Sequence, residues 1–298
     1  MVTQNLLAFR PPCIDDVQAI KACTHHDMRS DLSAANLFLL RHKYDTQLVF
    51  HMEHLIRFYP NKGRLNGYTF PVGGRAEDIP QCLDAIKKDA LTRDVNLQFC
   101  LLTETEAEYI KDYFGKSASV FCDAGDADYL YKRTELATLA GTKFHKKRNR
   151  LAAFKRNYTG HKFAPLTNEN KHFALQIAEQ WCCTQVPCPA LVHELQAIKQ
   201  ALFHFDALQL QGGLVYVNDK PVGMCITSLI NEYVADVHYE KCLPDFRDAY
   251  VYINNELAQH LKTDLINREE DLNIPGLRTA KLAYNPSIIL KKFSATIC

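Results

Sequence analysis

The stretch LVYVNDKPVGMCITSL, residues 214–229, has two apolar runs on either side of Asn218-Asp219-Lys220-Pro221. Asparagine, aspartate and proline favour tight turns, so the pattern predicts two strands joined as a hairpin, at Leu214–Val217 and Val222–Leu229. The pattern after this hairpin predicts a strand at Tyr233–Tyr239, a helix at Tyr250–Leu261 and a short strand at Leu265–Ile266.

The first half of the chain has the same order of elements. Its predicted hairpin, strand, helix and final strand are Gln47–Phe50 with Leu55–Tyr59, Tyr68–Val72, Ile79–Leu91 and Val95–Leu102. The order occurs near residues 47–102 and again near 214–267, which predicts an α+β protein with two similar units in tandem. Further helices are expected at Asp15–Ala22, Glu104–Tyr113, Phe173–Trp181 and Leu191–Phe203.

Composition is that of an ordinary globular protein. The chain has 298 residues, 47% of them hydrophobic and 23% charged, with a net charge of +1. It has no run of about 18 uncharged apolar residues, so we predict no transmembrane segment. The N-terminus lacks the basic start and apolar core of a secretory signal, and a cytoplasmic location is expected.

Cysteine usage is typical of a reducing compartment. The 11 cysteines form no CxxC pair and do not fit a secreted disulfide scaffold. Cys182, Cys183 and Cys188 lie close to His193, but a zinc site usually has paired ligands at two-to-four-residue spacing. We interpret these thiols as small apolar residues and expect no metal site. The histidines of a predicted hairpin turn, His51 and His54, are interpreted as surface residues.

The segment from Leu136 to Asn168 contains no acidic residue. It holds eight of the 35 basic residues. The rest of the chain therefore has 27 basic and 34 acidic residues. Leu151, Phe154 and Tyr158 recur at helical spacing and predict a helix over Lys147–Tyr158 with one apolar stripe. Its basic flanks suit a nucleic acid, a phosphate-bearing cofactor or an anionic membrane, although a solvated helix face has the same composition. The eight cations are Lys143, Lys146, Lys147, Arg148, Arg150, Lys155, Arg156 and Lys162.

Two segments near the C-terminus carry candidate chemistry. In a regular strand His238 and Glu240 point to the same face, where they would form a general-base pair; an exposed strand edge is the alternative. If Pro275–Ala283 is a helix, Arg278 and Lys281 share a face and can clamp a phosphate or carboxylate. Alternatively, the arginines pair with the acidic turn, in which case Arg268 and Arg278 bind Glu269, Glu270 and Asp271.

Several common catalytic motifs are absent from the sequence. We find no GxGxxG, no GxxxxGK[ST], no HExxH and no GxSxG. Rossmann dehydrogenases, P-loop NTPases, zincin proteases and nucleophile-elbow hydrolases are therefore unsupported.

A set of ordered motifs resembles the bacterial DUF2156 family over nearly the whole chain. The first half contributes DYLY (128–131), then Leu139, Gly141 and HKKRN (145–149). The second half contributes Glu240-Lys241, Tyr250, Ile253-Asn254, Glu256, INREEDL (266–272), GLR (276–278), Lys281, Tyr284 and Pro286. This family resembles the catalytic part of phosphatidylglycerol lysyltransferases and, more distantly, Fem-type peptidyltransferases.

The resemblance implies two tandem GNAT-like acyltransferase domains with mixed sheets flanked by helices. We expect the first at residues 1–140 and the second at 141–298, with the basic helix 143–158 at the seam. It also implies a transferase that moves an aminoacyl group from a charged tRNA to an amine or hydroxyl. The acceptor would be a small amine, a peptide or a lipid headgroup; the last would require peripheral membrane contact.

The resemblance implies roles for the candidate residues in the transfer reaction. Glu240, with Glu256 as second choice, would accept the proton of the acceptor, and Arg278 and Lys281 would serve the oxyanion or the terminal phosphate. The predicted donor-binding residues are Lys146, Lys147, Arg148, Asn149, Asn267 and Arg268.

Two alternatives remain at this point. A CoA thioester is another possible donor, but the [Q/R]xxGx[G/A] loop of CoA enzymes is missing. The equivalent stretch, Asp245–Tyr250, has no glycine and two acids, and Val72–Arg75 in the first unit is nearer but incomplete. The other alternative is a non-catalytic module of the same fold that binds RNA or an anionic surface.

Overall fold

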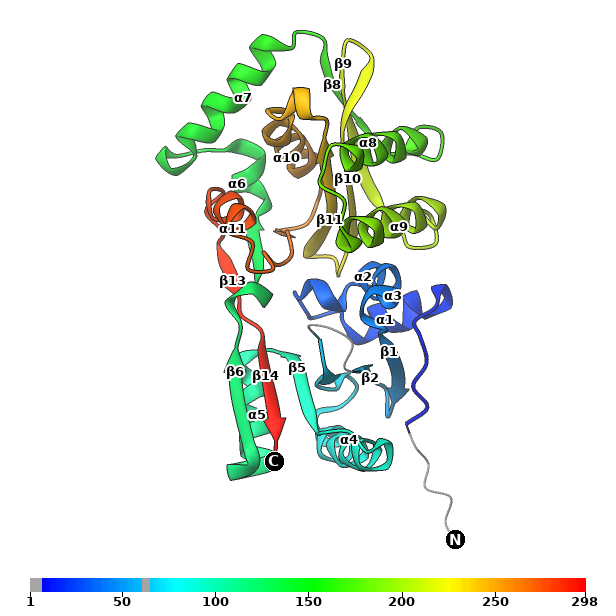
Figure 1. The fold of residues 1–298 in the computed structure, drawn as a ribbon. Helices are drawn as coiled ribbons and strands as arrows, with labels where there is room; N and C mark the ends of the chain where they lie inside the picture. The colour runs from blue at the N-terminus through cyan, green and yellow to red at the C-terminus, as the bar shows by residue number, and fades with distance from the viewer. Residues whose placement is uncertain (1–6, 61–64) are drawn as a thin grey trace.

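The computed structural model describes residues 7–60 and 65–298 and contains two seven-stranded sheets, one above the other in Figure 1. In the first sheet the strands are ordered β1-β2-β3-β5-β14-β6, with β4 beside β2. In the second sheet the order is β13-β7-β12-β11-β10-β9-β8. The predicted α+β class with two mixed sheets in tandem is confirmed.

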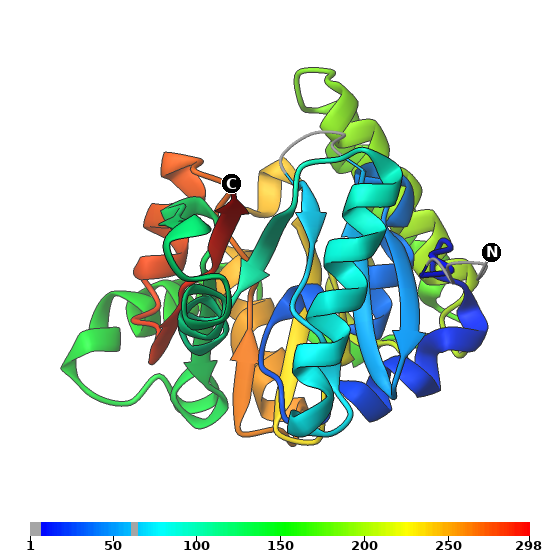
Figure 2. The same ribbon diagram turned by 90° about the horizontal axis from the view of Figure 1, so that it is seen from below.

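The first unit contains both strands of the predicted first hairpin, β1 and β2. Its strands are β1 (Gln47–His51), β2 (His54–Tyr59), β3 (Gly67–Tyr68), β4 (Val72–Gly73), β5 (Gln98–Leu102) and β6 (Ala118–Cys122). Its helices are α1 (Val17–Cys23), α2 (Ala34–Leu39), α3 (Arg41–Tyr44), α4 (Ile79–Arg93) and α5 (Glu104–Phe114). Figure 2 looks onto α4, which covers one face of the first sheet.

The second unit is built around the predicted hairpin β9–β10. Its strands are β7 (Asp128–Lys132), β8 (His161–Pro165), β9 (Gln211–Val217), β10 (Lys220–Leu229), β11 (Val234–Cys242), β12 (Leu265–Asn267) and β13 (Ile288–Leu290). Its helices are α6 (Arg133–Thr138), α7 (His145–Asn157), α8 (Lys171–Cys183), α9 (Pro189–Phe203), α10 (Ala249–His260) and α11 (Pro275–Leu282).

The chain crosses between the sheets twice. β7, which precedes residue 140, belongs to the second sheet, and the last strand, β14 (Phe293–Ile297), inserts between β5 and β6 of the first. The division between the sheets therefore does not follow a single cut at residue 140. One hydrophobic cluster also joins the units, because α1 and α2 contribute side chains to the same core as α8 and α9.

The β1–β2 turn buries one of the histidines that we expected at the surface. His54 is fully buried and its Nδ1 lies 2.8 Å from the carbonyl of Met52. β4 pairs with β2 here, and a Cβ on Gly74 would lie 2.3 Å from the His54 ring. The surface prediction is wrong for His54, because β4 covers the end of the hairpin.

Candidate active site

The parallel strands at the centre of the second sheet diverge after a short pairing. β11 and β12 pair over three residues, from Val234 opposite Leu265 to Asp236 opposite Asn267. β11 continues to Cys242, whereas β12 ends at Asn267. Side chains of β11 beyond Asp236 and of the turn after β12 can therefore contact one another in the gap between the two strands.

Glu240 and Arg268 form an ion pair across this divergence. Arg268 donates from Nη2 to Glu240 Oε2, and Asn254 on α10 donates to Oε1 at 2.5 Å. Both charged side chains are largely buried. Because each charge is matched, the site holds a carboxylate and a guanidinium out of bulk water.

Aromatic rings and a lysine surround the guanidinium. The carbon Cζ of Arg268 lies 5.2 Å from the ring centroid of Tyr284 and 5.9 Å from that of Tyr131. Lys147 of α7 lies over the same Tyr284 ring, with Nζ 3.5 Å from the centroid. Burial, together with the charges of Arg268 and Arg150, lowers the pKa of Lys147 to about 8. One lysine of the basic helix thus contacts the same tyrosine ring as Arg268.

Lys281 supports the turn that carries Arg268. Its Nζ donates to the carbonyl of Arg268 and, at 3.2 Å, to the carbonyl of Glu269. Tyr131 in turn donates to the carbonyl of Lys281 at 2.9 Å. Burial and the charge of Arg268 lower the pKa of Lys281. The ammonium is therefore next to the ion pair and is held by backbone oxygens.

Arg278 has a different partner from the other two cations. It makes two hydrogen bonds to Asp271, at 2.7 and 2.9 Å, and Tyr129 donates to the same carboxylate at 2.6 Å. The pairing of Arg278 with the acidic turn is thus present in the structure. Arg268, by contrast, pairs with Glu240 outside that turn.

The basic helix docks by its apolar stripe. Phe154 is buried and its ring stacks on Tyr252 of α10, with centroids 4.9 Å apart. Leu151 and Tyr158 pack against the same cluster. α7 therefore lies on α10, as Figure 1 shows.

The cations of this segment divide into paired and unpaired groups. Lys143, Lys155 and Lys162 contact Glu135, Glu256 and Asp219, at 2.7, 3.8 and 2.6 Å. Arg148 donates to the carbonyls of Leu139 and Gly141. Lys146, Arg150 and Arg156 are exposed and form no ion pair within residues 7–60 and 65–298. These three form the uncompensated basic surface of α7.

The remaining predicted residues make no hydrogen bond to the ion pair in the part of the chain that the structure describes. The side chain of Asn149 is 3.5 Å from His145, one turn earlier on α7. Glu256 is half-buried beside Lys155. Asn267 is buried and donates to Asp128 at 3.0 Å. Its Oδ1 accepts from the backbone of Glu269, which fixes the start of the turn.

A β-bulge interrupts β11 between the two predicted general-base residues. Tyr239 lies opposite Ile226, but Val237 lies opposite the next residue, Thr227, so His238 is an extra residue. Val237 packs in the core beneath α10, whereas Tyr239 packs in the core with α8 and α9. The bulge therefore inverts the alternation of side chains along the strand.

His238 and Glu240 consequently point to opposite faces, and the prediction that they share one is wrong. Glu240 reaches Asn254 of α10. His238 instead places Nε2 2.8 Å from Ser228 Oγ, which is 3.1 Å from Ser33 Oγ in the first unit. His238 thus belongs to the junction between the units.

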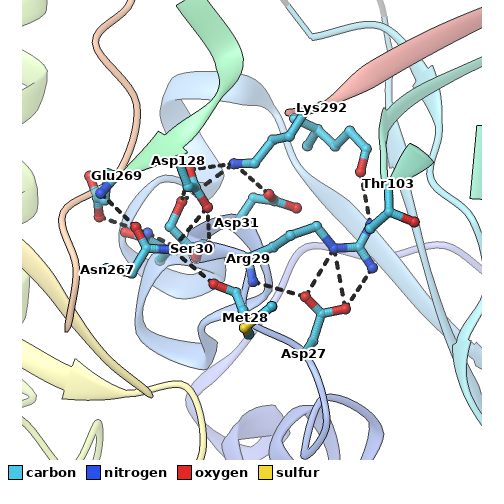
Figure 3. Close-up of polar contacts among 12 residues, drawn as sticks. Asp27, Met28, Arg29, Ser30, Asp31, Thr103, Asp128, Asn267, Glu269 and Lys292 are labelled. Atoms are coloured by element: carbon cyan, nitrogen blue, oxygen red, sulfur yellow. Dashed lines mark hydrogen bonds and ion pairs between the residues drawn. The ribbon is translucent and has the colours of Figure 1, made fainter. Parts of the chain in front are cut away.

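This junction contains a buried ionic network that sequence reasoning missed (Figure 3). Lys292 contacts Asp128 at 2.7 Å and Asp31 at 2.8 Å, and Ser30 donates to Asp128 at 2.7 and 2.9 Å. Asp31 also binds the buried Arg57 at 2.8 Å. The one available signal was Asp128, the first residue of the DYLY motif; the other members have no sequence spacing in common.

A small cavity of about 50 Å³ lies beside the network. Its polar wall contains Asp31, Asn36, Glu269, Glu270 and Lys292, and its apolar wall comes from α2, α3 and β5. This volume holds a few water molecules or an ion rather than an amino acid.

The fold of two tandem mixed sheets is shared with the FemX structure, at 8% identity and a TM-score of 0.59 over 96% of this chain and 96% of that one. The family model described as "Phosphatidylglycerol lysyltransferase, C-terminal" matches residues 25–296. The chain belongs to this family, and the predicted family resemblance is confirmed.

Individual relatives extend this finding. A conserved protein of unknown function from Bacteroides thetaiotaomicron is 33% identical, with a TM-score of 0.92 over 98% of this chain and 100% of that one. The C-terminal DUF2156 domain of a putative lysylphosphatidylglycerol synthetase from Agrobacterium fabrum is 15% identical, with a TM-score of 0.68 over 95% and 91%. An uncharacterised protein of Mycoplasmoides gallisepticum is 26% identical over 202 residues, and the match spans 64% of this chain and 62% of that protein.

Membership of this family supports a transferase. Among the helices in residues 7–60 and 65–298, none has both the length and the hydropathy of a membrane span.

Proposed function

We propose that the protein transfers an aminoacyl group from an aminoacyl-tRNA to an amine or hydroxyl acceptor, such as a small amine, a peptide or a lipid headgroup. The observation that carries this proposal is the position of α7. Lys147 of this helix lies over Tyr284, the ring that Arg268 of the Glu240–Arg268 pair also contacts, and the charge of Arg150 from the uncompensated basic surface acts on both Lys147 and Tyr284. An RNA backbone held on this helix would bring its terminus toward a carboxylate and a guanidinium.

The reaction needs a proton acceptor and a cation. The acceptor nitrogen or oxygen attacks the carbonyl carbon of the ester, and the bond to the terminal ribose breaks. We assign the departing proton to Glu240, from which it passes to the ribose oxygen. Arg268 and Lys281 face the negative charge that develops on the carbonyl oxygen. For Glu240 to act, the substrate must take over part of its contact with Arg268.

The other candidate residues have supporting roles in this proposal. Lys146, Lys147, Arg148 and Asn149 line the RNA path. Asn267 and Arg278 hold the 266–272 turn through Asp128 and Asp271. Glu256 orients Lys155 on α7.

A CoA thioester is the alternative donor, and the start of α10 disfavours it. Asp245 and Asp248 lie directly before this helix, in a short turn without glycine. A pyrophosphate binds best at a helix N-terminus because the backbone N–H groups and the dipole attract anions. Two carboxylates oppose that attraction. An aminoacyl-tRNA donor also implies that the enzyme works in the cytoplasm, where tRNA is charged.

Binding of charged and deacylated tRNA at physiological salt, with acetyl-CoA as competitor, tests the donor. We expect charged tRNA to bind more tightly and acetyl-CoA not to compete; sequencing the bound tRNA then identifies the amino acid. If acetyl-CoA binds and the two tRNA forms show the same salt-sensitive affinity, the donor is a CoA thioester. Binding without turnover would indicate a non-catalytic module.

Two substitutions test the assigned roles. Glu240→Gln is expected to lower the transfer rate by about 10²–10⁴, the usual effect of removing a general base, without weakening tRNA binding. Lys281→Met is expected to abolish transfer in a protein that remains folded. The matched controls are Glu108→Gln and Lys262→Met, at exposed positions. A fully active Lys281→Met enzyme excludes a role for this ammonium.

A further inference from the structure

One buried aspartate differs from all the others in its surroundings. Among the residues that the structure describes, six aspartates are buried. Five of them pair with an arginine or lysine, as Asp16–Arg10, Asp78–Arg75, Asp89–Arg93, Asp128–Lys292 and Asp271–Arg278. Asp236, which is fully buried, has no such partner among the described residues: its Oδ2 lies 3.5 Å from His238 Nδ1 and 3.2 Å from the neutral amide of Asn36, and its Oδ1 has no hydrogen-bond partner. A buried carboxylate needs a matched cation, and no arginine or lysine forms an ion pair with Asp236 within the described residues.

A second carboxylate points to the same place. Glu269 Oε1 lies 3.2 Å from His238 Nδ1, and Asn36 Nδ2 lies 2.9 Å from Glu269 and 3.2 Å from Asp236. One donor atom from each of Asp236, His238 and Glu269 lies within 4.8 Å of the others. Two negative groups thus converge on one imidazole and one neutral amide.

The distances from His238 Nδ1 to the two carboxylate oxygens are those of ligands on a single metal ion. With bonds of about 2.1 Å, neighbouring ligand atoms are about 3.0 Å apart in octahedral and about 3.4 Å apart in tetrahedral coordination. His238 Nδ1 is 3.2 Å from the glutamate oxygen and 3.5 Å from the aspartate oxygen. One imidazole nitrogen and two carboxylate oxygens suit Zn²⁺, Mn²⁺ or Fe²⁺.

The surroundings of His238 support this geometry. Ser228 Oγ is 2.8 Å from Nε2 and 3.1 Å from Ser33 Oγ. A serine that accepts the Nε2 proton leaves the Nδ1 lone pair free, which is how proteins orient a metal-binding histidine. The amide of Asn36 is placed to donate to both carboxylates outside the coordination sphere.

The adjoining cavity supplies access and further ligands. Asn36 and Glu269 line it, and its volume of about 50 Å³ holds the waters that would complete the coordination. The ligands come from β11 and from the turn after β12, and Asn36 comes from α2 in the first unit. An ion here would fasten the two units together.

We propose that Asp236, His238 and Glu269 bind one divalent transition-metal ion at the junction of the two units. The proposal does not depend on the transfer reaction. Its competitor is a proton, on His238 or on Asp236, that balances the two carboxylates. Burial and the charge of Glu269 do raise the pKa of Asp236, so protonation and metal binding must be separated by experiment.

Manganese binding to the full chain separates them. The protein is stripped with a chelator and titrated with Mn²⁺, whose bound fraction is read by electron paramagnetic resonance. Mn²⁺ is chosen because thiolates favour zinc, and the chain has free cysteines at its surface, among them Cys183 and Cys188. We expect one Mn²⁺ per chain and a Tm that rises with Mn²⁺ concentration. A Cys182→Ser/Cys183→Ser/Cys188→Ser variant must bind Mn²⁺ as the wild type does.

The decisive variant is Asp236→Asn, which has nearly the same shape. We expect its Mn²⁺ affinity to fall about 100-fold and the metal-induced rise in Tm to disappear. Asp89→Asn is the matched control, since Asp89 is equally buried but lies in the first unit beside Arg93. If the wild type binds no stoichiometric Mn²⁺, or Asp236→Asn binds it equally well, the site holds a proton instead. Neither outcome alters the tRNA-binding result, so failure of the two proposals is distinguishable.

Discussion

Lys292 is a buried lysine whose charge is matched by aspartates from distant parts of the chain. Its Nζ lies 2.7 Å from Asp128 and 2.8 Å from Asp31. Burial opposes the charge, but Asp128 and Asp31 outweigh burial and raise the pKa of Lys292. Such a network adds little net stability compared with apolar residues, yet losing one partner leaves unmatched buried charges.

Replacing Lys292 is therefore expected to be costly. We predict that Lys292→Met lowers the free energy of unfolding by about 3–5 kcal/mol, because Asp128 and Asp31 lose their shared cation. Urea unfolding of both variants gives the comparison, with Lys291→Met as the control at an exposed neighbouring position. Equal urea midpoints for the two variants would contradict the structural role of the network.

The side chain of Lys147 is expected to titrate within the pH range in which most enzymes work. Burial and the charges of Arg268 and Arg150 lower its pKa to about 8, so the folded state releases this proton before the unfolded state does. Between about pH 8 and the ordinary lysine pKa, near 10.4, the unfolded state binds more protons, and this group makes stability rise with pH.

The titration is directly measurable. In a protein with ¹³C-labelled lysines, NMR should show one side-chain resonance with a midpoint near pH 8 that is missing from Lys147→Met. The same variant should lose the corresponding rise in stability with pH. A spectrum with no lysine that titrates below pH 9 contradicts the burial of this ammonium against Tyr284.

At the scale of elements, the sequence patterns predicted most helices and strands. The hairpins, the α4 and α10 helices and the apolar stripe of α7 are all present, because local periodicity and turn residues decide them. The bulge at His238 was not predictable, since it depends on how β11 pairs with β10. Its consequence for the site is large: it separates His238 from Glu240 and places each in a different cluster.

The basic surface of α7 should govern RNA binding without affecting stability. We predict that Lys146→Gln/Arg150→Gln/Arg156→Gln binds tRNA at least tenfold more weakly at 0.1 M salt, because these cations have no ion pair in the described structure. The slope of log affinity against log salt should become shallower by about 2–3. Tm should stay unchanged, since the stripe of Leu151 and Phe154 is intact.

The control for α7 uses cations that already have partners. Lys143→Gln/Lys162→Gln removes two charges that pair with Glu135 and Asp219, so it should leave the salt slope almost unaltered. A triple variant that keeps wild-type tRNA affinity would remove the support that α7 gives to the proposed donor.

For the whole molecule, the decisive feature is the return of the chain to the first unit. β14 pairs with β5 and β6, nearly 200 residues from β5 and about 175 from β6. The sequence patterns predicted neither this strand nor its partners, because register between distant strands leaves no local pattern. The Lys292 network was unpredictable for the same reason, as Asp31, Asp128 and Lys292 meet only in the folded chain.

This arrangement predicts that both units unfold together. Ala295 on β14 is 1% exposed in the core of the first unit, whereas the only tryptophan, Trp181, lies on α8 in the second. Ala295→Asp buries an unpaired charge, and we expect it to destabilise the protein by about 3 kcal/mol or more. Because the shared core and the Lys292 network link the units, the urea midpoint reported by Trp181 fluorescence should fall as far as that reported by circular dichroism. Cys298→Asp, at an exposed position, should change neither. If the Trp181 midpoint stays at its wild-type value in Ala295→Asp, the second unit is stable on its own and the links through β14 do not transmit stability.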